Sequence, residues 1–401
     1  MERAVLERSS GYSRESRLPS ATTSADHPRT VAMVGTYPPT ECGLATFTNN
    51  LSLAIATRES HWRVDVVRVL DVAESETRDE VGAQWIARDR GSLARAVRAT
   101  ETADVVILQH EYGLFSGPDG ADVLDFVDAL TRPLVVVLHS VLSLPTERQR
   151  WILERLVSAA ALVVVQSRHA RERLMRDYGV DSRHVEVIAH GAAQNFDQAS
   201  DEVGLHPRVL TWGLLGPGKG IEHAIAAVAR LDAASPAPHY VVAGATHPKV
   251  LAAQGEGYRF SLHSLARRLG VADRVHFDPG YRDWNSLRAL VRSADVVLLP
   301  YESREQESSG VLVEALASGK PVVATAFPHA VELLSSGAGI VVPHGDIDAM
   351  SEALARVLFE PGVASAMRAC ARREARSLMW PAIGASYRDL ISRVVALEER
   401  S

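Results

Sequence analysis

The stretch DVVLLPYESREQESSGVLVEALASGKPVVATAFP, residues 295–328, has the most regular local pattern in the chain. An apolar run at Val296–Pro300 predicts a buried strand, and a polar loop follows it. Residues Ser309–Ser318 then have the composition of a helix, and Val322–Thr325 reads as a second buried strand. A strand, a helix and a strand in this order are typical of a parallel α/β sheet.

The start of this predicted helix is suited to bind an anion. Ser308 and Ser309 are good N-cap residues, and Gly319 is a good C-cap, so both helix ends are well signalled. Unpaired backbone N–H groups and the positive end of the helix dipole favour a phosphate there. Glu314 lies inside the same apolar helix, where a carboxylate is costly without hydrogen-bond donors. The hydrogen-bond donors for Glu314 could come from a ribose diol or from another group of the chain.

Length and composition narrow the class of protein. A chain of 401 residues is long for one core, which predicts two domains, and 46% apolar with 23% charged residues is typical of a soluble globular protein. A net charge of −6 disfavours a general nucleic-acid binder. The two cysteines, Cys42 and Cys370, cannot form a disulfide framework, which fits the cytoplasm. No apolar run is long enough for a membrane helix, and we expect no transmembrane segment.

The predicted elements repeat along the chain in two sets. Val/Ile/Leu-rich strands alternate with helical patterns, which indicates parallel sheets covered on both faces. The polar stretch 195–207 interrupts the pattern. We therefore expect an α/β fold with two Rossmann-like, doubly wound domains facing across a cleft. The predicted parts are a disordered tail at 1–28, an N-terminal domain at 29–200, a C-terminal domain at 201–379 and a last helix at 380–401.

Open α/β sheets bind ligands at the carboxyl ends of their strands, so polar residues that follow strands are site candidates. Gly43 lies where a helix begins after the first strand and would let the backbone approach a phosphate, although a simple turn explains it better when it is taken alone. Lys219 lies in a glycine-rich turn after a strand of the second domain, where it is well placed to bind a phosphate. Its neighbours in that turn are Gly213 and Gly220. Candidates for the cleft in the first domain are Tyr37, His110, Glu111 and His190, with His139 as the preferred histidine, although a structural role explains each histidine equally when it is taken singly.

These residues together resemble the family 4 glycosyltransferases, retaining enzymes with the two-domain GT-B fold. The resemblance covers nearly the whole chain from about residue 29, and its most specific part runs from Gln306 to Val323. Glu314 matches the second Glu of the family's Glu-(seven residues)-Glu motif, which binds the ribose. The first Glu falls on Gln306, and the Arg of the family's phosphate clamp falls on Leu214; both are departures.

The same resemblance assigns roles to the other candidates. The catalytic residues would be His139, Lys219 and Gln306. Lys219 would bind the diphosphate, and His139 would lie beside the reacting sugar. The segment from Trp380 resembles the helix that crosses back onto the first domain. The donor-binding residues would be Gly43, Gly213, Lys219, Gly220, Ser308, Ser309, Gly310, Val311 and Glu314. The residues on the acceptor or sugar side would be Tyr37, His110, Glu111 and His190.

The resemblance implies transfer of a sugar from a nucleotide-diphosphate sugar to a glycan, lipid or small-molecule acceptor, with retention of configuration. We expect no bound cofactor, no metal ion and no nucleic-acid partner. A catalytically weakened sugar-nucleotide-binding or scaffold protein, and another GT-B activity such as a nucleotide-sugar epimerase, are the alternatives. The protein is expected in the cytoplasm. Contact with a membrane surface would fit the arginines of residues 148–173, although a solvated helix face explains them better.

Overall fold

The computed structural model describes residues 29–57, 61–75, 78–196, 205–231, 236–280 and 282–400. The predicted disordered tail at 1–28 lies outside these residues. The first sheet has seven parallel strands in the order β3-β2-β1-β4-β5-β6-β7. These strands are β1 (Thr30–Gly35), β2 (Arg63–Leu70), β3 (Val81–Ile86), β4 (Val105–His110), β5 (Leu134–Leu138), β6 (Leu162–Val165) and β7 (Val185–Val187).

The second sheet has six parallel strands in the order β10-β9-β8-β11-β12-β13. In both sheets the order in which successive strands are added therefore reverses beside the first strand, between β1 and β4 and between β8 and β11. Such a reversal opens a crevice at the carboxyl ends of the strands. The strands are β8 (Arg208–Trp212), β9 (His239–Ala243), β10 (Val275–Asp278), β11 (Val296–Leu299), β12 (Val322–Thr325) and β13 (Gly339–Val342).

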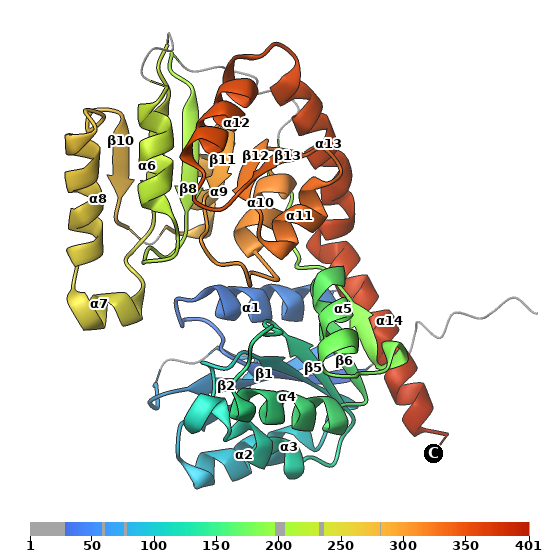
Figure 1. Cartoon of the computed structure of the whole chain (residues 1–401). Helices are drawn as coiled ribbons and strands as arrows, with labels where there is room; N and C mark the ends of the chain where they lie inside the picture. Colours follow the sequence, from blue (N-terminus) through green and yellow to red (C-terminus); the bar gives the residue numbers. More distant parts are fainter. Residues whose placement is uncertain are drawn as a thin grey trace, which may run out of the picture.

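Helices cover both sheets, and Figure 1 shows the two domains stacked with α1 on the side of the first domain that faces the second. The helices of the first domain are α1 (Gly43–Ile55), α2 (Arg90–Thr100), α3 (Val123–Asp128), α4 (Glu147–Ala159) and α5 (Arg168–Asp177), with short 3₁₀ turns at Pro118–Gly120 and Ser182–His184. Those that follow are α6 (Ile221–Ala229), α7 (Pro248–Gln254), α8 (Gly257–Arg268), α9 (Trp284–Arg292), α10 (Gly310–Ala317), α11 (Pro328–Leu334), α12 (Ile347–Phe359), α13 (Val363–Leu378) and α14 (Trp380–Glu398).

The last helix, α14, leaves the second domain and packs on the first (Figure 1). Its residues Tyr387 and Leu390 belong to the same buried cluster as Val31 of β1. The contact with α1 is close, because a Cβ atom at Gly384 would lie 2.2 Å from the carbonyl oxygen of Ala54. This helix therefore ties the two sheets together through the core of the first domain.

The predicted fold class, two doubly wound parallel sheets facing across a cleft, is confirmed. The predicted helix after β11 begins at Gly310, and the side chain of Ser309 caps it. One strand, β3, was not predicted from the sequence. It lies at the sheet edge, and only Trp85 of its residues is buried, so the strand lacks the continuous apolar run of the central strands.

Candidate active site

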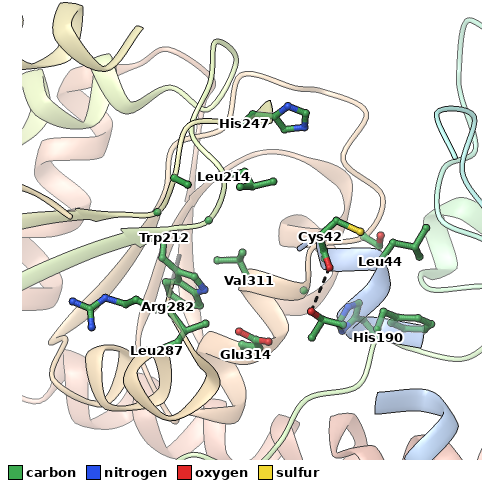
Figure 2. A pocket seen from close by; sticks show the side chains of 18 of the residues that line it. Cys42, Leu44, His190, Trp212, Leu214, His247, Arg282, Leu287, Val311 and Glu314 are labelled. Atoms are coloured by element: carbon green, nitrogen blue, oxygen red, sulfur yellow. Dashed lines mark hydrogen bonds between the residues drawn. The ribbon is translucent and has the colours of Figure 1, made fainter. Parts of the chain in front are cut away.

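A cavity of about 610 Å³ lies between the two sheets. Its walls come from the segments that follow β1, β4, β5 and β7 in the first domain and β8, β9, β10 and β11 in the second, and from Trp380 at the start of α14. In Figure 2, Cys42, Leu44 and His190 lie on one side, while Trp212 and Arg282 lie on the other, with Glu314 between them. The cavity therefore sits at the two crevices that the strand order creates, and both domains build it.

The glycine-rich turn after β8 holds Lys219 in the cavity wall. Gly220 adopts a φ of +64°, and a Cβ atom there would lie 1.9 Å from the carbonyl oxygen of Pro300, so only glycine fits. The Lys219 ammonium lies 4.5 Å from the centre of the Tyr301 ring. Burial lowers the pKa of Lys219. No carboxylate among the described residues forms a salt bridge with this lysine. The turn thus presents a cation that an anionic ligand can neutralise.

The amino end of α10 reaches the same cavity. The Ser309 hydroxyl accepts a hydrogen bond from the Leu312 amide at 3.2 Å, and the Ser309 amide donates to Nδ1 of His329 at 2.9 Å. Ser308, Gly310 and Val311 line the cavity beside these capping contacts. The first turn of this helix therefore faces the cavity with its backbone, as an anion site at a helix start requires.

Glu314 lies one turn further along α10 and also lines the cavity (Figure 2). Burial raises the pKa of its carboxyl group to about 7, and a hydrogen bond from the Trp212 side chain opposes that shift. Trp212 is thus a donor from within the chain. It supplies one hydrogen bond to a group that can accept several, so Glu314 retains capacity for ligand hydroxyls.

Of the first-domain histidines, His139 and His190 line the cavity. The Nε2–H of His139 donates to the Gln109 side-chain oxygen at 2.7 Å, and its Nδ1 accepts from the Gln166 amide at 3.1 Å. Burial lowers the pKa of His139 to about 3 and that of His190 to about 4. Both rings are therefore neutral, and His139 has no nitrogen left to act as a base.

Two predicted acceptor-side residues do not belong to the cavity wall. Tyr37 is buried, and its hydroxyl donates to Glu80 at 2.8 Å. His110 is the last residue of β4 and is also buried, with its ring next to Phe115 and Tyr112. Successive side chains at the end of β4 point to opposite sides, so the His110 ring lies in the core, while the next residue, Glu111, reaches the cavity.

Gln306 lines the cavity, while the two glutamates beside it turn to the first domain. The Arg173 guanidinium of α5 lies 2.7 Å from the Glu305 carboxylate and 2.8 Å from that of Glu307. Glu305 also accepts hydrogen bonds from the backbone amide and the hydroxyl of Ser143. These contacts hold the 303–309 loop of the second domain onto the first, with Gln306 between the two carboxylates. We call them the interdomain latch (Arg173, Ser143, Glu305 and Glu307).

Sequence reasoning missed several residues of the cavity wall. Arg282 follows β10 and is ion-paired with Asp278, and Trp284 and Leu287 of α9 lie on the same side. Their position after a strand was a usable signal, but the residues between β10 and α9 form no recognisable motif. Trp380, at the start of α14, enters the cavity next to Phe47 and His190. His247 was not missed: it belongs to the segment 246–249, whose position after the β9 strand predicts a place in the cleft, and it lines the cavity.

Among the described residues, no cluster of His, Cys, Asp and Glu side chains has the geometry of a metal site. Within the same part of the chain, none of the helices combines the length and the apolar character that crossing a bilayer needs.

Two family models match adjoining parts of the chain. The model described as "Glycosyltransferase Family 4" matches residues 44–194, and the one described as "Glycosyl transferases group 1" matches residues 194–376. A curated relative, the D-inositol 3-phosphate glycosyltransferase of Rhodococcus opacus, is 30% identical over 57% of this chain and 52% of its own length. The alpha-D-kanosaminyltransferase of Streptomyces kanamyceticus is 28% identical over 69% of this chain and 72% of its own. The match thus spans about half of the first relative and more of the second.

Solved structures show the same architecture. The sucrose-phosphate synthase of Thermosynechococcus elongatus superposes with a TM-score of 0.73 at 19% identity, over 92% of this chain and all of that one. Anabaena HepE in complex with UDP and glucose also gives 0.73 at 19% identity, over 91% and 100%. The adjoining family matches change over at residue 194, between the last strand of the first sheet and the first strand of the second. The chain belongs to the group 1 glycosyltransferases of family 4.

Proposed function

We propose that this protein transfers a glycosyl unit from a nucleotide-diphosphate sugar to an acceptor hydroxyl, with retention of configuration. The observation that carries the proposal is one cavity that contains Lys219, the amino end of α10 and Glu314. The first two suit a diphosphate, and the third suits a ribose diol. Two groups that suit a diphosphate, with a third that suits a ribose diol, favour a nucleotide sugar over a simpler anion.

The proposed chemistry places the stabilising charges at the leaving group. Departure of the nucleoside diphosphate builds negative charge on its phosphate oxygens. The Lys219 ammonium and the backbone N–H groups at Gly310 and Val311 would stabilise that charge in a partly dehydrated site. Because these donors already complement the diphosphate, we propose that the reaction does not depend on a metal ion.

Retention is proposed to follow from displacement on one face of the sugar, in which the departing phosphate takes the acceptor proton. Two findings support this route. The ring nitrogens of His139 are both hydrogen-bonded, so this residue positions the sugar or acceptor instead of removing a proton. Gln306 can donate to and accept from sugar hydroxyls but cannot act as a charged nucleophile.

The relatives give starting points for the substrates. HepE was solved with UDP and glucose, so a UDP-sugar is the first donor to test. The curated relatives are named for transfer involving D-inositol 3-phosphate and kanosamine, and we propose a glycan, glycolipid or small-molecule acceptor. UDP-, GDP- and ADP-sugars should be screened by thermal shift, because a ligand of the folded state raises its melting temperature.

A second function, a sugar-nucleotide-binding protein with weakened catalysis, is favoured by Gln306 and Leu214, which replace the family's Glu and Arg. Incubation with radiolabelled nucleotide sugars and a lysate acceptor pool separates the two functions. The enzyme would produce a labelled product or hydrolyse the donor. Binding without either reaction would support the second function, and interconversion of the donor sugar would support an epimerase.

We propose a cytoplasmic location, which the two free cysteines support. Contact with a membrane surface has weaker support. The arginines Arg148, Arg150 and Arg155 form ion pairs with Asp119, Glu154 and Asp128, so α4 presents paired charges to its surroundings. This arrangement is typical of a solvated helix face.

A further inference from the structure

The charges around the cavity are unevenly divided between the domains. Both cationic side chains in the described wall, Lys219 and Arg282, come from the second domain. The first domain contributes glycine, apolar and neutral polar residues from the start of α1, two histidines and one carboxylate, that of Glu111. Lysine and arginine are therefore absent from the described first-domain wall. The diphosphate of the proposed sugar donor needs cations, and both cations lie on the second-domain side of the cavity.

The first-domain histidines do not supply the missing positive charge. Burial holds the pKa of His139 near 3 and that of His190 near 4, so neither ring is protonated at neutral pH. Hydrogen bonds also fix both rings, because Nδ1 of His190 donates to the carbonyl oxygen of Gly191 at 2.7 Å. The first-domain wall thus carries one negative charge and no positive one.

Two further cations do not line this wall. The Arg68 guanidinium is fully buried and donates to the Tyr37 carbonyl, the Thr40 hydroxyl and the Glu74 carboxylate. The ammonium of Lys249, on α7, would lie 3.5 Å from a Cβ atom at Gly113. It approaches from the second domain and does not line the cavity.

Glu111 is held in a fixed orientation. Its Oε2 accepts a hydrogen bond from the Ser140 hydroxyl at 2.6 Å, and its Oε1 accepts from the Tyr112 amide at 3.0 Å. A carboxylate offers about four lone-pair sites, so these two contacts leave capacity for a ligand. Hydroxyl and ammonium groups can donate to it, whereas a phosphate meets a like charge without a counter-ion.

We infer that the acceptor presents hydroxyl or amino groups, and no phosphate, to the first-domain wall, and that Glu111 binds it. This inference rests on the proposed function, because it assumes that the donor occupies the second-domain side. It narrows the acceptor to neutral or amine-bearing polyols. The physical basis is the single uncompensated carboxylate on the acceptor side.

The test uses acceptors that differ mainly in charge. Glucose, glucosamine and glucose 6-phosphate form one series, and myo-inositol, 2-deoxystreptamine and myo-inositol 3-phosphate form another. Each is supplied to the full chain with the nucleotide sugar that gives the largest thermal shift, and both glycosyl transfer and donor hydrolysis are measured. We expect kcat/KM for the neutral or amino member to exceed that for the phosphorylated member at least tenfold in one series or both.

Variants connect this preference to Glu111. Glu111→Gln should raise KM for the amino member and leave the Kd of the nucleoside diphosphate unchanged, and Glu111→Lys should reduce or invert the charge preference. Glu101→Lys, at an exposed helix end, is the matched charge-reversal control. A preference for the phosphorylated member that Lys249→Ala abolishes would overturn the inference, as would donor hydrolysis without transfer to any neutral or amino member. If no nucleotide sugar binds or reacts, the proposed function itself fails, and this outcome is distinct.

Discussion

Glu314 should make donor binding depend on pH. Burial raises the pKa of this carboxyl group to about 7 in the ligand-free protein. A carboxylate accepts hydrogen bonds from both ribose hydroxyls, whereas the protonated form has lost part of that capacity. Binding therefore favours release of the Glu314 proton. Because the folded pKa is raised, the proton is held below pH 7, and affinity falls as the pH falls through that value.

The magnitude follows from the titration. With a pKa of about 7, the ionised fraction of Glu314 falls from about nine-tenths at pH 8 to about one-tenth at pH 6. If only the ionised form binds the diol, the Kd of the nucleoside diphosphate rises about tenfold over this range, or about 1.4 kcal/mol. Residual hydrogen bonding to the protonated form would make the change smaller.

Isothermal titration calorimetry at several pH values measures this change with the nucleoside diphosphate that stabilises the protein most. The ligand phosphate also titrates, so the wild type is compared with Glu314→Gln, in which the phosphate contribution remains. The 2′-deoxy analogue is the matched ligand, because it lacks one of the two hydroxyls. Glu307→Gln is a second control, since burial raises the pKa of Glu307 to about 7 as well. An equal pH dependence in the wild type and Glu314→Gln would refute the proposed ribose contact.

Three other predictions test the cavity and the latch. Lys219→Met should weaken nucleoside diphosphate binding at least about tenfold, because a charge-assisted hydrogen bond contributes roughly 1.5–3 kcal/mol. Binding of the nucleoside alone should be unchanged. Calorimetry that shows equal losses of affinity for both ligands would argue against a phosphate contact. Arg173→Met leaves buried Glu307 without its cation, so the free energy of unfolding should fall by up to the roughly 3–5 kcal/mol typical of such losses, and the melting temperature should fall with it. Glu307→Gln in the same variant should restore part of this loss, and a lack of restoration would contradict the latch. Gly310→Ala should lower donor affinity several-fold in the thermal-shift assay, because the new Cβ would lie 2.9 Å from Nε2 of His190. Gly82→Ala is the control, because open space surrounds that position, and it should leave donor affinity unchanged. Equal effects of the two variants on donor affinity would count against this reasoning.

Much of the fold was predictable from the sequence because it depends on local patterns. Buried parallel strands such as β5 are continuous apolar runs, and helix α10 has its own start signal in Ser309 and its own stop signal in Gly319. Lys219 and Glu314 could be identified because each follows a strand with an unusual local composition. The strand β3 had no such signal, since it lies at an edge with little buried surface.

Only the tertiary structure decided which candidates share a site. His110 and Glu111 are neighbours in the sequence, but the pleat of β4 directs one ring into the core, while the next residue reaches the cavity. Arg173 and Glu307 are distant in the chain, and docking of the domains makes them partners. The sequence by itself determined two doubly wound sheets and the glycine-rich turn at Lys219, because strands, helices and turns follow from patterns within a few residues. The docking of the domains decided which residues line the cavity together and which form the latch, because contacts between distant segments leave no local pattern.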